Sequence, residues 1–88
     1  MPSPELALQP PPSIEALYAD HHGWLQGWLR RRLGNTWDAA DVAHDAFLRL
    51  MAAPRSFAGP PQARLYLRTM ANGICVDLWR RRQIEEAW

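Results

Sequence analysis

The feature that most constrains the fold is the spacing of the apolar residues. They recur every three or four positions in three separate stretches of the 88-residue chain, a period typical of α-helices that bury one face. No stretch alternates as a β-strand does. The sequence therefore predicts an all-α protein, a compact bundle of three or four helices. The three apolar series are Ile14, Leu17, Tyr18, Trp24, Leu25, Trp28 and Leu29; Val42, Ala43, Ala46, Phe47, Leu50 and Met51; and Leu67, Met70, Ala71, Ile74 and Leu78.

Two breaks separate these stretches. "LGN" at 33–35 predicts a helix end with Gly34 in the left-handed conformation, and "APRSFAGPPQ" at 53–62 predicts a loop. We expect helices over about 14–33, from Thr36 or Asp38 as the cap to Pro54, and over about 63–86. Ser13 suits the first N-cap. Gly23 and Gly27, four residues apart inside the first helix, favour close approach by another helix.

The two ends of the chain differ from its middle. Residues 1–12, "MPSPELALQPPP", hold five of the eight prolines, so we expect a disordered, Pro-rich tail before a single domain at 13–88. No Gly or Pro stops the third helix before Trp88. We therefore interpret the chain as a fragment of a longer protein.

Charge is balanced in total and uneven along the chain. The net charge is +1, and all ten cations are arginines. Five of these arginines gather in the last third of the chain, whereas three aspartates gather near its middle. This asymmetry indicates two different partner surfaces. The clusters are Arg64, Arg68, Arg80, Arg81 and Arg82, and Asp38, Asp41 and Asp45.

Catalytic chemistry has little support in the sequence. No nucleophile–base pair, phosphate-binding glycine loop or dinucleotide fingerprint is present, so we expect neither an enzyme nor a cofactor. His21 and His22 look like an exposed pair without the further ligands of a metal site. Cys75, the single cysteine, is expected in or near the core and fits a reducing compartment. With no signal sequence and no apolar run of about 18 residues, we expect a cytoplasmic protein.

The outer face of the third helix combines hydroxyl, amide, aromatic and guanidinium groups. These groups can hydrogen-bond base edges, stack on bases and contact phosphates. A polar outer face with one unburied tryptophan explains the same residues. The acidic side of the second helix likewise reads either as a partner surface or as solvated charge with an Asp45–Arg49 pair. The residues of the third-helix face are Thr69, Asn72, Val76, Trp79, Arg80 and Gln83.

A family resemblance bears on this choice. "DAADVAHDAFLRLM" at 38–51, followed by the loop and by "ARLYLRTMANGICVDLWRRR" at 63–82, resembles region 2 of an extracytoplasmic-function sigma factor. The stretch from Leu17 to Leu50 is especially similar to the iron-uptake branch, the ferric-citrate-transport regulators. The resemblance covers about 13–88 and does not include region 4, which would read the −35 element.

The resemblance implies a helical bundle that binds RNA polymerase and opens the −10 element. It implies that the second helix docks on the clamp helices of the polymerase β′ subunit. It also implies that the loop at 55–62 captures a flipped non-template base, with Phe57 or a neighbour as a pocket wall and Asn72 helping to hold that base. A membrane-linked anti-sigma regulator is a further implied partner. The implied polymerase-binding residues are Asp41, Asp45, Phe47, Leu48 and Arg49, and the implied DNA-binding residues are Arg55, Ser56, Phe57, Arg68, Thr69, Asn72, Val76, Trp79, Arg80 and Gln83.

Two other functions stay open at the level of the sequence. One is a helix-turn-helix repressor, although its recognition helix is usually short and follows a turn of about 3–4 residues. The other is a helical protein-interaction module that never touches DNA. Co-purification with core polymerase separates the sigma-factor reading from both.

Overall fold

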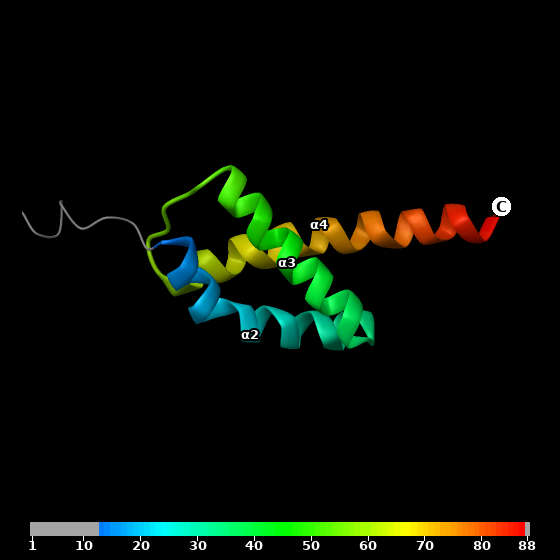
Figure 1. The fold of residues 1–88 in the computed structure, drawn as a ribbon, viewed down its shortest axis with the longest axis horizontal. Helices are drawn as coiled ribbons and strands as arrows, with labels where there is room; N and C mark the ends of the chain where they lie inside the picture. The colour runs from blue at the N-terminus through cyan, green and yellow to red at the C-terminus, as the bar shows by residue number, and fades with distance from the viewer. Residues whose placement is uncertain (1–12, 88) are drawn as a thin grey trace, which may run out of the picture.

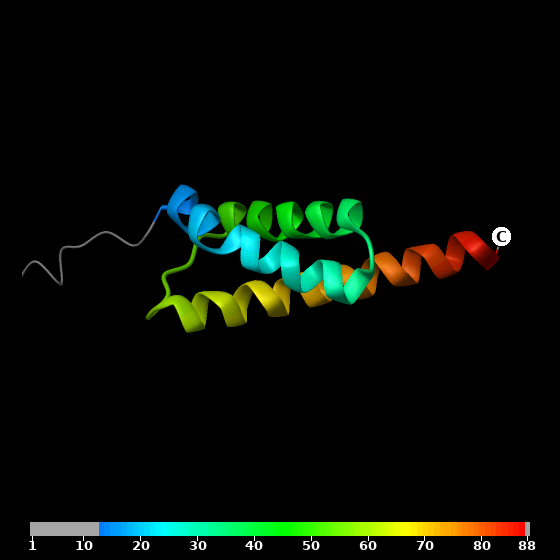
Figure 2. The same ribbon diagram turned by 90° about the horizontal axis from the view of Figure 1, so that it is seen from below.

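The computed structural model describes residues 13–87, which form three helices: α2 (Ile14–Leu33), α3 (Thr36–Ala52) and α4 (Pro60–Ala87) (Figure 1). α2 and α4 run in the same direction (Figures 1 and 2). α3 runs in the opposite direction and connects the end of α2 to the loop before α4. Each helix packs on the other two. The predicted all-α bundle is thereby confirmed for these residues, and the tail predicted at 1–12 lies outside them.

The helix ends follow local hydrogen bonding. Ser13 caps α2 as predicted, accepting a bond from the Ala16 N–H at 3.1 Å. Gly34 ends α2 with φ at 77°, in the left-handed region. The cap predicted for the next helix is wrong, because Asn35 caps α3 in place of Thr36 or Asp38. Its side-chain oxygen accepts from the Asp38 N–H at 2.8 Å, and its amide donates to the Asp38 carboxylate at 2.6 Å.

α4 begins three residues earlier than predicted. Pro60 and Pro61 belong to its first turn and not to the loop, which is confined to 53–59. The N–H groups of a first turn have no partner within the helix, so proline loses nothing there, and its fixed φ suits the helix. The Ala63 N–H then donates to the Gly59 carbonyl oxygen at 3.1 Å.

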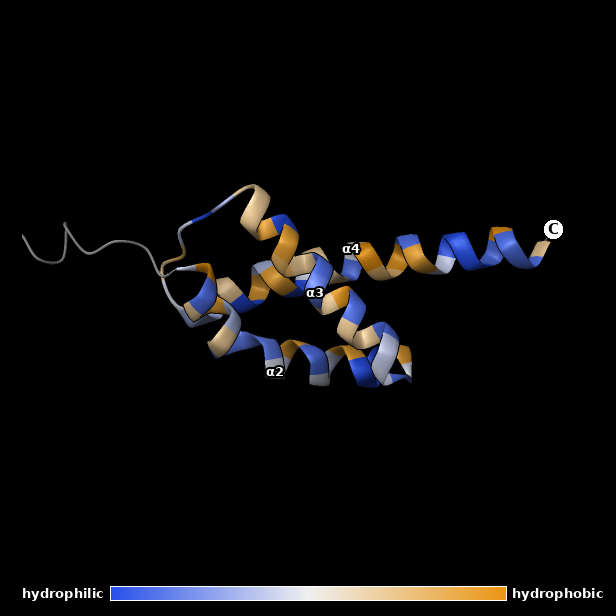
Figure 3. Ribbon diagram, viewed as in Figure 1, coloured by the Kyte–Doolittle hydropathy of each residue, from blue (hydrophilic) through white to orange (hydrophobic). Residues whose placement is uncertain are grey.

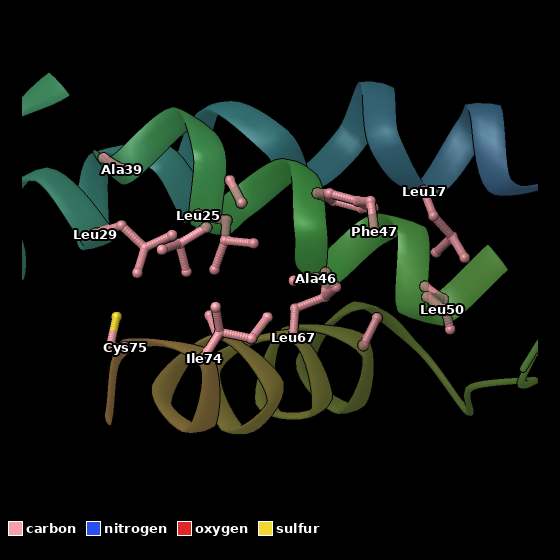
Figure 4. Close-up of a cluster of buried hydrophobic side chains, with 14 residues drawn as sticks. Leu17, Leu25, Leu29, Ala39, Ala46, Phe47, Leu50, Leu67, Ile74 and Cys75 are labelled. Atoms are coloured by element: carbon pink, nitrogen blue, oxygen red, sulfur yellow. The ribbon is translucent and has the colours of Figure 1, made fainter. Parts of the chain in front are cut away.

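The core lies where the three helices meet (Figure 4). Ala39, Ala43 and Ala46 of α3 are buried, and side chains this small let helix backbones approach closely. Cys75 is fully buried, which confirms its predicted place in the core. The larger buried core side chains are Leu17, Leu25 and Leu29 from α2, Val42, Phe47 and Leu50 from α3, and Leu67 and Ile74 from α4.

The end of α4 extends past the bundle (Figure 1). Cys75 is the last buried residue described, and every described residue from Trp79 onward is exposed. This segment is largely hydrophilic (Figure 3). Two contacts tie it to the bundle: the Arg82–Asp38 ion pair, whose nitrogen and oxygen lie 2.7 Å apart, and the Arg32 guanidinium 5.7 Å from the centre of the Trp79 ring. No described helix, α4 included, is both long and apolar enough to cross a membrane.

The close helix approach expected at Gly23 and Gly27 is not found. A Cβ placed on Gly23 would meet nothing within 4 Å. A Cβ placed on Gly27 would meet only the Arg30 side chain of its own helix, at 3.9 Å. These glycines therefore lie at open positions, and helix packing does not offset their cost to the helix.

Candidate nucleic-acid and polymerase interfaces

Arginine–tryptophan pairs join α2 to α4 outside the apolar core. The Arg64 guanidinium lies 4.8 Å from the centre of the Trp24 ring, and the Arg68 guanidinium lies 5.5 Å from the Trp28 ring. Residues four apart occupy successive turns of one helix face. The two parallel helices thus face each other with a constant offset of 40 residues, the same separation that joins Arg32 to Asn72.

Arg32 is the centre of this contact. Its guanidinium lies 5.2 Å from the Trp28 ring and 5.7 Å from the Trp79 ring. It also donates a hydrogen bond to the side-chain oxygen of Asn72. Burial raises the pKa of the neighbouring Cys75 thiol, and the Arg32 charge opposes that rise. One α2 side chain therefore joins both tryptophans to the predicted base-reading amide.

A shallow hollow of about 250 Å³ opens beside Arg32. It offers an aromatic face, two guanidinium groups, a hydroxyl and an amide. The Thr69 hydroxyl donates to the Leu65 carbonyl oxygen of its own helix at 2.8 Å. Such a set can stack on a base and hold its phosphate. The hollow is lined by Trp28, Arg32, Leu65, Arg68, Thr69 and Asn72.

The loop between α3 and α4 lies apart from this hollow. Phe57 is half-buried against the core, with its ring centre 5.4 Å from that of Tyr66. The Arg55 guanidinium lies 5.0 Å from the Tyr66 ring, and Ser56 is exposed. No loop residue lines the hollow at Asn72. The structure thus places the predicted pocket wall and the predicted base-holding amide at two separate sites.

The predicted polymerase-binding residues divide between surface and core. Asp41, Leu48 and Arg49 are exposed, and Asp45 pairs with Arg49 at 3.5 Å, as the sequence suggested. Phe47 is only 4% exposed and meets the Tyr18 ring edge-on at 5.0 Å. Phe47 can therefore support this surface from beneath but offers little area to a partner.

An apolar hollow of about 330 Å³ lies beside Leu48, between α2 and α3. Tyr18 and Met51, both assigned to the buried faces by their spacing, are 44% and 53% exposed at its edge. Sequence reasoning missed this hollow because an apolar residue at a helical period reads the same whether it is covered or not. Its lining is Ile14, Glu15, Tyr18, His44, Phe47, Leu48 and Met51.

A family comparison decides what kind of helical bundle carries these surfaces. The model of "Sigma-70 region 2" matches residues 17–84, most of the chain. The chain belongs to the sigma-70 region 2 family.

Two curated relatives agree with this assignment. The chain is 42% identical over 76 residues to the ferric citrate uptake sigma factor FecI of Escherichia coli, covering 86% of this chain and 43% of that protein. It is 32% identical over 69 residues to the RNA polymerase sigma factor YlaC of Bacillus subtilis, covering 78% of this chain and 40% of that protein. No solved structure matches the chain significantly. The chain spans about two-fifths of the length of these relatives, and the predicted resemblance to the iron-uptake branch is confirmed.

The predicted DNA-binding residues of this region 2 occupy three places. Arg68, Thr69 and Asn72 share the hollow against α2. The α4 residues beyond it run toward the free end of the helix, where Trp79 is 39% exposed, Arg80 and Gln83 are exposed and Val76 is half-buried. Arg55, Ser56 and Phe57 stay with the loop. Trp28 and Arg32 of α2 line the same hollow as Arg68, Thr69 and Asn72. They were not among the DNA-binding residues predicted from the sequence, although their spacing of four residues on one helix was a signal that could have pointed to them.

His21 corrects the expectation of an exposed histidine pair. It is 4% exposed, and its Nδ1 accepts a hydrogen bond from Arg64 Nε at 3.3 Å. Burial lowers the pKa of His21, the Arg64 charge lowers it further, and Asp20 opposes both. His22 stays nearer the surface, where its Nδ1–H donates to the Tyr18 carbonyl oxygen at 2.8 Å. Among residues 13–87, no three His, Cys, Asp or Glu side chains gather as metal ligands would.

Proposed function

We propose that this chain binds core RNA polymerase through α3 and helps to open the promoter −10 element by capturing non-template bases on α4. The observation that carries the proposal is the hollow where Trp28, Arg68 and Asn72 meet. Residues 13–88 act as one region 2 domain, and the chain performs no bond chemistry of its own. Bond formation belongs to the polymerase.

The DNA side of the proposal depends on an arrangement formed before DNA arrives. Taking a base out of the stack costs a few kcal/mol. Aromatic stacking returns about 1–3 kcal/mol per base, and guanidinium groups at the same hollow add attraction to the phosphates. Because Trp28 and Arg68 already lie against each other, little ordering is required on binding. The segment 55–62, which contains the end of the loop and the first turn of α4, supplies a second contact to the melted strand.

The polymerase side of the proposal rests on α3. Asp41 and Asp45 lie one turn apart, and Leu48 continues the same stripe. The apolar hollow at Leu48 and Met51 adds surface that a helical partner can cover. We propose that the β′ clamp helices bind this stripe.

The likeness to a ferric citrate uptake sigma factor supports a narrower proposal. We propose that the chain acts at promoters of iron-uptake genes, in the cytoplasm, under a membrane-linked anti-sigma regulator. Run-off transcription by core polymerase with the full-length protein on candidate iron-uptake promoters tests this choice of promoters. Transcription that does not exceed the level from unrelated promoters would rule it out.

The test of polymerase binding is charge reversal on α3. Asp41→Arg and Asp45→Arg together should weaken binding to core polymerase by at least tenfold, because they replace two attractive charges by two repulsive ones. Asp20→Arg, an exposed change on α2, is the control and should bind as the wild type does. Affinity is measured by titration against core polymerase and folding by circular dichroism. Unchanged affinity in a folded double variant would contradict the proposal, and DNA binding without any polymerase would favour a repressor.

A further inference from the structure

The Arg32–Asn72 hydrogen bond determines which way the Asn72 amide faces. An asparagine side chain carries an acceptor oxygen and a donor NH₂, and the two exchange places when the amide rotates by 180°. A guanidinium group carries donors only. The atom that faces Arg32 is therefore the Asn72 oxygen, and chemistry alone excludes the opposite orientation.

Arg32 is itself held in place. Its guanidinium lies between the Trp28 and Trp79 rings, at 5.2 and 5.7 Å from their centres. Cation–π contacts of this kind are worth about 0.5–1 kcal/mol each at exposed sites. The ion pairs described within 13–87 are Arg49–Asp45 and Arg82–Asp38, so no carboxylate there draws Arg32 away from Asn72.

We propose that Arg32 is a positioning residue that orients the Asn72 amide so that it presents its NH₂ donors, and not its oxygen, to a base. With its oxygen bonded to α2, Asn72 offers its NH₂ group to the hollow and can satisfy a carbonyl oxygen or an unprotonated ring nitrogen on a base edge. Its oxygen faces α2 and already accepts from Arg32, so the hollow presents it less readily than the NH₂ group to an exocyclic amino group. This inference rests on the proposed function, because it specifies how the −10 base site on α4 chooses its base.

Loss of the Arg32 donor should release the amide. Asn72 could then rotate and offer either its oxygen or its NH₂ group, so bases that present a donor would be tolerated as well. The variant Arg32→Met removes the donors and keeps an apolar chain against the tryptophans. The variant Arg32→Lys keeps a donor-only group and should keep the amide orientation.

The experiment measures base preference as the ratio of the affinities for two strands that differ in one base. Holoenzyme containing each variant binds non-template −10 strands that carry each of the four bases at each position in turn. Asn72→Ala identifies the position that Asn72 reads. Arg32→Met should lose about 3- to 10-fold of the preference at that same position, the value of one hydrogen bond. The double variant should lose no more than Asn72→Ala does, and Arg32→Lys should keep the wild-type preference.

Two controls separate positioning from folding and from charge. Arg31→Met removes the same charge from the same exposed turn of α2 and should keep the preference. A variant that only folds less well lowers its affinity for every strand and leaves the ratio unchanged. Removal of the exocyclic amino group from the preferred base should not reduce the part of the affinity that depends on Asn72.

Three results would overturn the inference. One is an equal loss for all strands in Arg32→Met, and the second is losses from Arg32 and Asn72 that add in the double variant. The third is a loss of the Asn72-dependent affinity when the amino group is removed. If Asn72→Ala itself changes no preference, the proposed base-reading site on α4 fails together with the inference. If Asn72→Ala changes a preference and Arg32→Met does not, only the inference fails.

Discussion

At the scale of single residues, His21 links the fold to pH. The histidine is buried and neutral, because its Nδ1 must stay unprotonated to accept from Arg64 Nε. Its pKa is lowered in the folded protein, whereas in the unfolded chain it is about 6.5. The unfolded state therefore binds more protons below about pH 6.5, and protonation favours unfolding.

We expect the free energy of unfolding to fall as the pH drops from about 6.5 toward the folded pKa of His21. His21→Asn keeps an acceptor for Arg64 and cannot be protonated. It should therefore reduce the change of the free energy of unfolding with pH. Urea unfolding between pH 5 and pH 7.5 measures it. His44→Asn, at an exposed position, is the control and should keep the wild-type slope. An unchanged slope in His21→Asn would show that another group causes the pH dependence.

Gly73 is a second residue whose surroundings decide its role. It lies in the interior of α4, and a Cβ placed on it would meet nothing within 4 Å. A neighbouring helix therefore does not require this glycine, and we predict that it allows close approach by DNA.

We predict that Gly73→Ala stabilises the fold by about 0.5–1 kcal/mol and weakens −10 binding by holoenzyme. Gly23→Ala, also at an open helical position, should give the same stabilisation without loss of binding. Thermal unfolding and strand-binding titrations measure the two effects. Equal binding by both variants would remove any role for Gly73 in DNA contact.

At the scale of helices, the free end of α4 is the least supported element. Isolated helices shorter than about 12–15 residues are marginal in water, and this end has no buried side chain after Cys75 among the residues described. Hydrogen bonds from Asn35 and Arg82 lower the pKa of Asp38, so the ion pair with Arg82 holds at neutral pH. Asp38 also sits in the first turn of α3, and it therefore ties the start of α3 to the end of α4.

Arg82→Ala should increase amide hydrogen exchange in the last turns of α4. The amides of 63–75 should exchange as in the wild type, because the core holds that half of the helix. Arg81→Ala is the matched control, since Arg81 makes no ion pair with Asp38. Equal exchange at 80–87 in both variants would show that the Asp38 ion pair does not support the helix end.

At the scale of the whole molecule, the two proposed interfaces share no residue. The acidic stripe belongs to α3, and the arginine–tryptophan face belongs to α2 and α4. Polymerase and DNA can therefore be bound at once without competing for one surface. This separation also allows variants on α4 to be read as DNA effects while polymerase binding stays intact.

Substitutions of Arg80 and Asn72 on α4 should consequently change −10 binding in different ways. Arg80→Ala should weaken binding to all −10 sequences about equally. If one phosphate contact is lost, the slope of the logarithm of the binding constant against the logarithm of the salt concentration should become shallower by about 0.7–0.9. Asn72→Ala should reduce discrimination at one position by about 1–3 kcal/mol. Holoenzyme binding to a panel of −10 variants at several salt concentrations measures both. A uniform loss in both variants would mean that Asn72 reads no base.

The sequence by itself determined the helices and most of their ends. Apolar period, the Ser13 cap and the left-handed Gly34 are local features, since each depends on residues within about four positions. The bounds of α2 were predicted correctly, and the cap of α3 was missed by one residue because Asn35, Thr36 and Asp38 all have the chemistry of a cap. The family resemblance was also readable from the order and spacing of short motifs.

Only the tertiary structure decided which faces meet. The rotation and offset of α2 against α4 bring Arg32 to Asn72 and Arg64 to His21, across 40 and 43 residues of sequence. The same rotation buries His21 and leaves Tyr18 half exposed, although both lie on one helix. A helical period shows that a face is apolar but does not show how much of it the neighbouring helices cover. Coverage follows from the packing of all three helices together, and no local pattern contains that information.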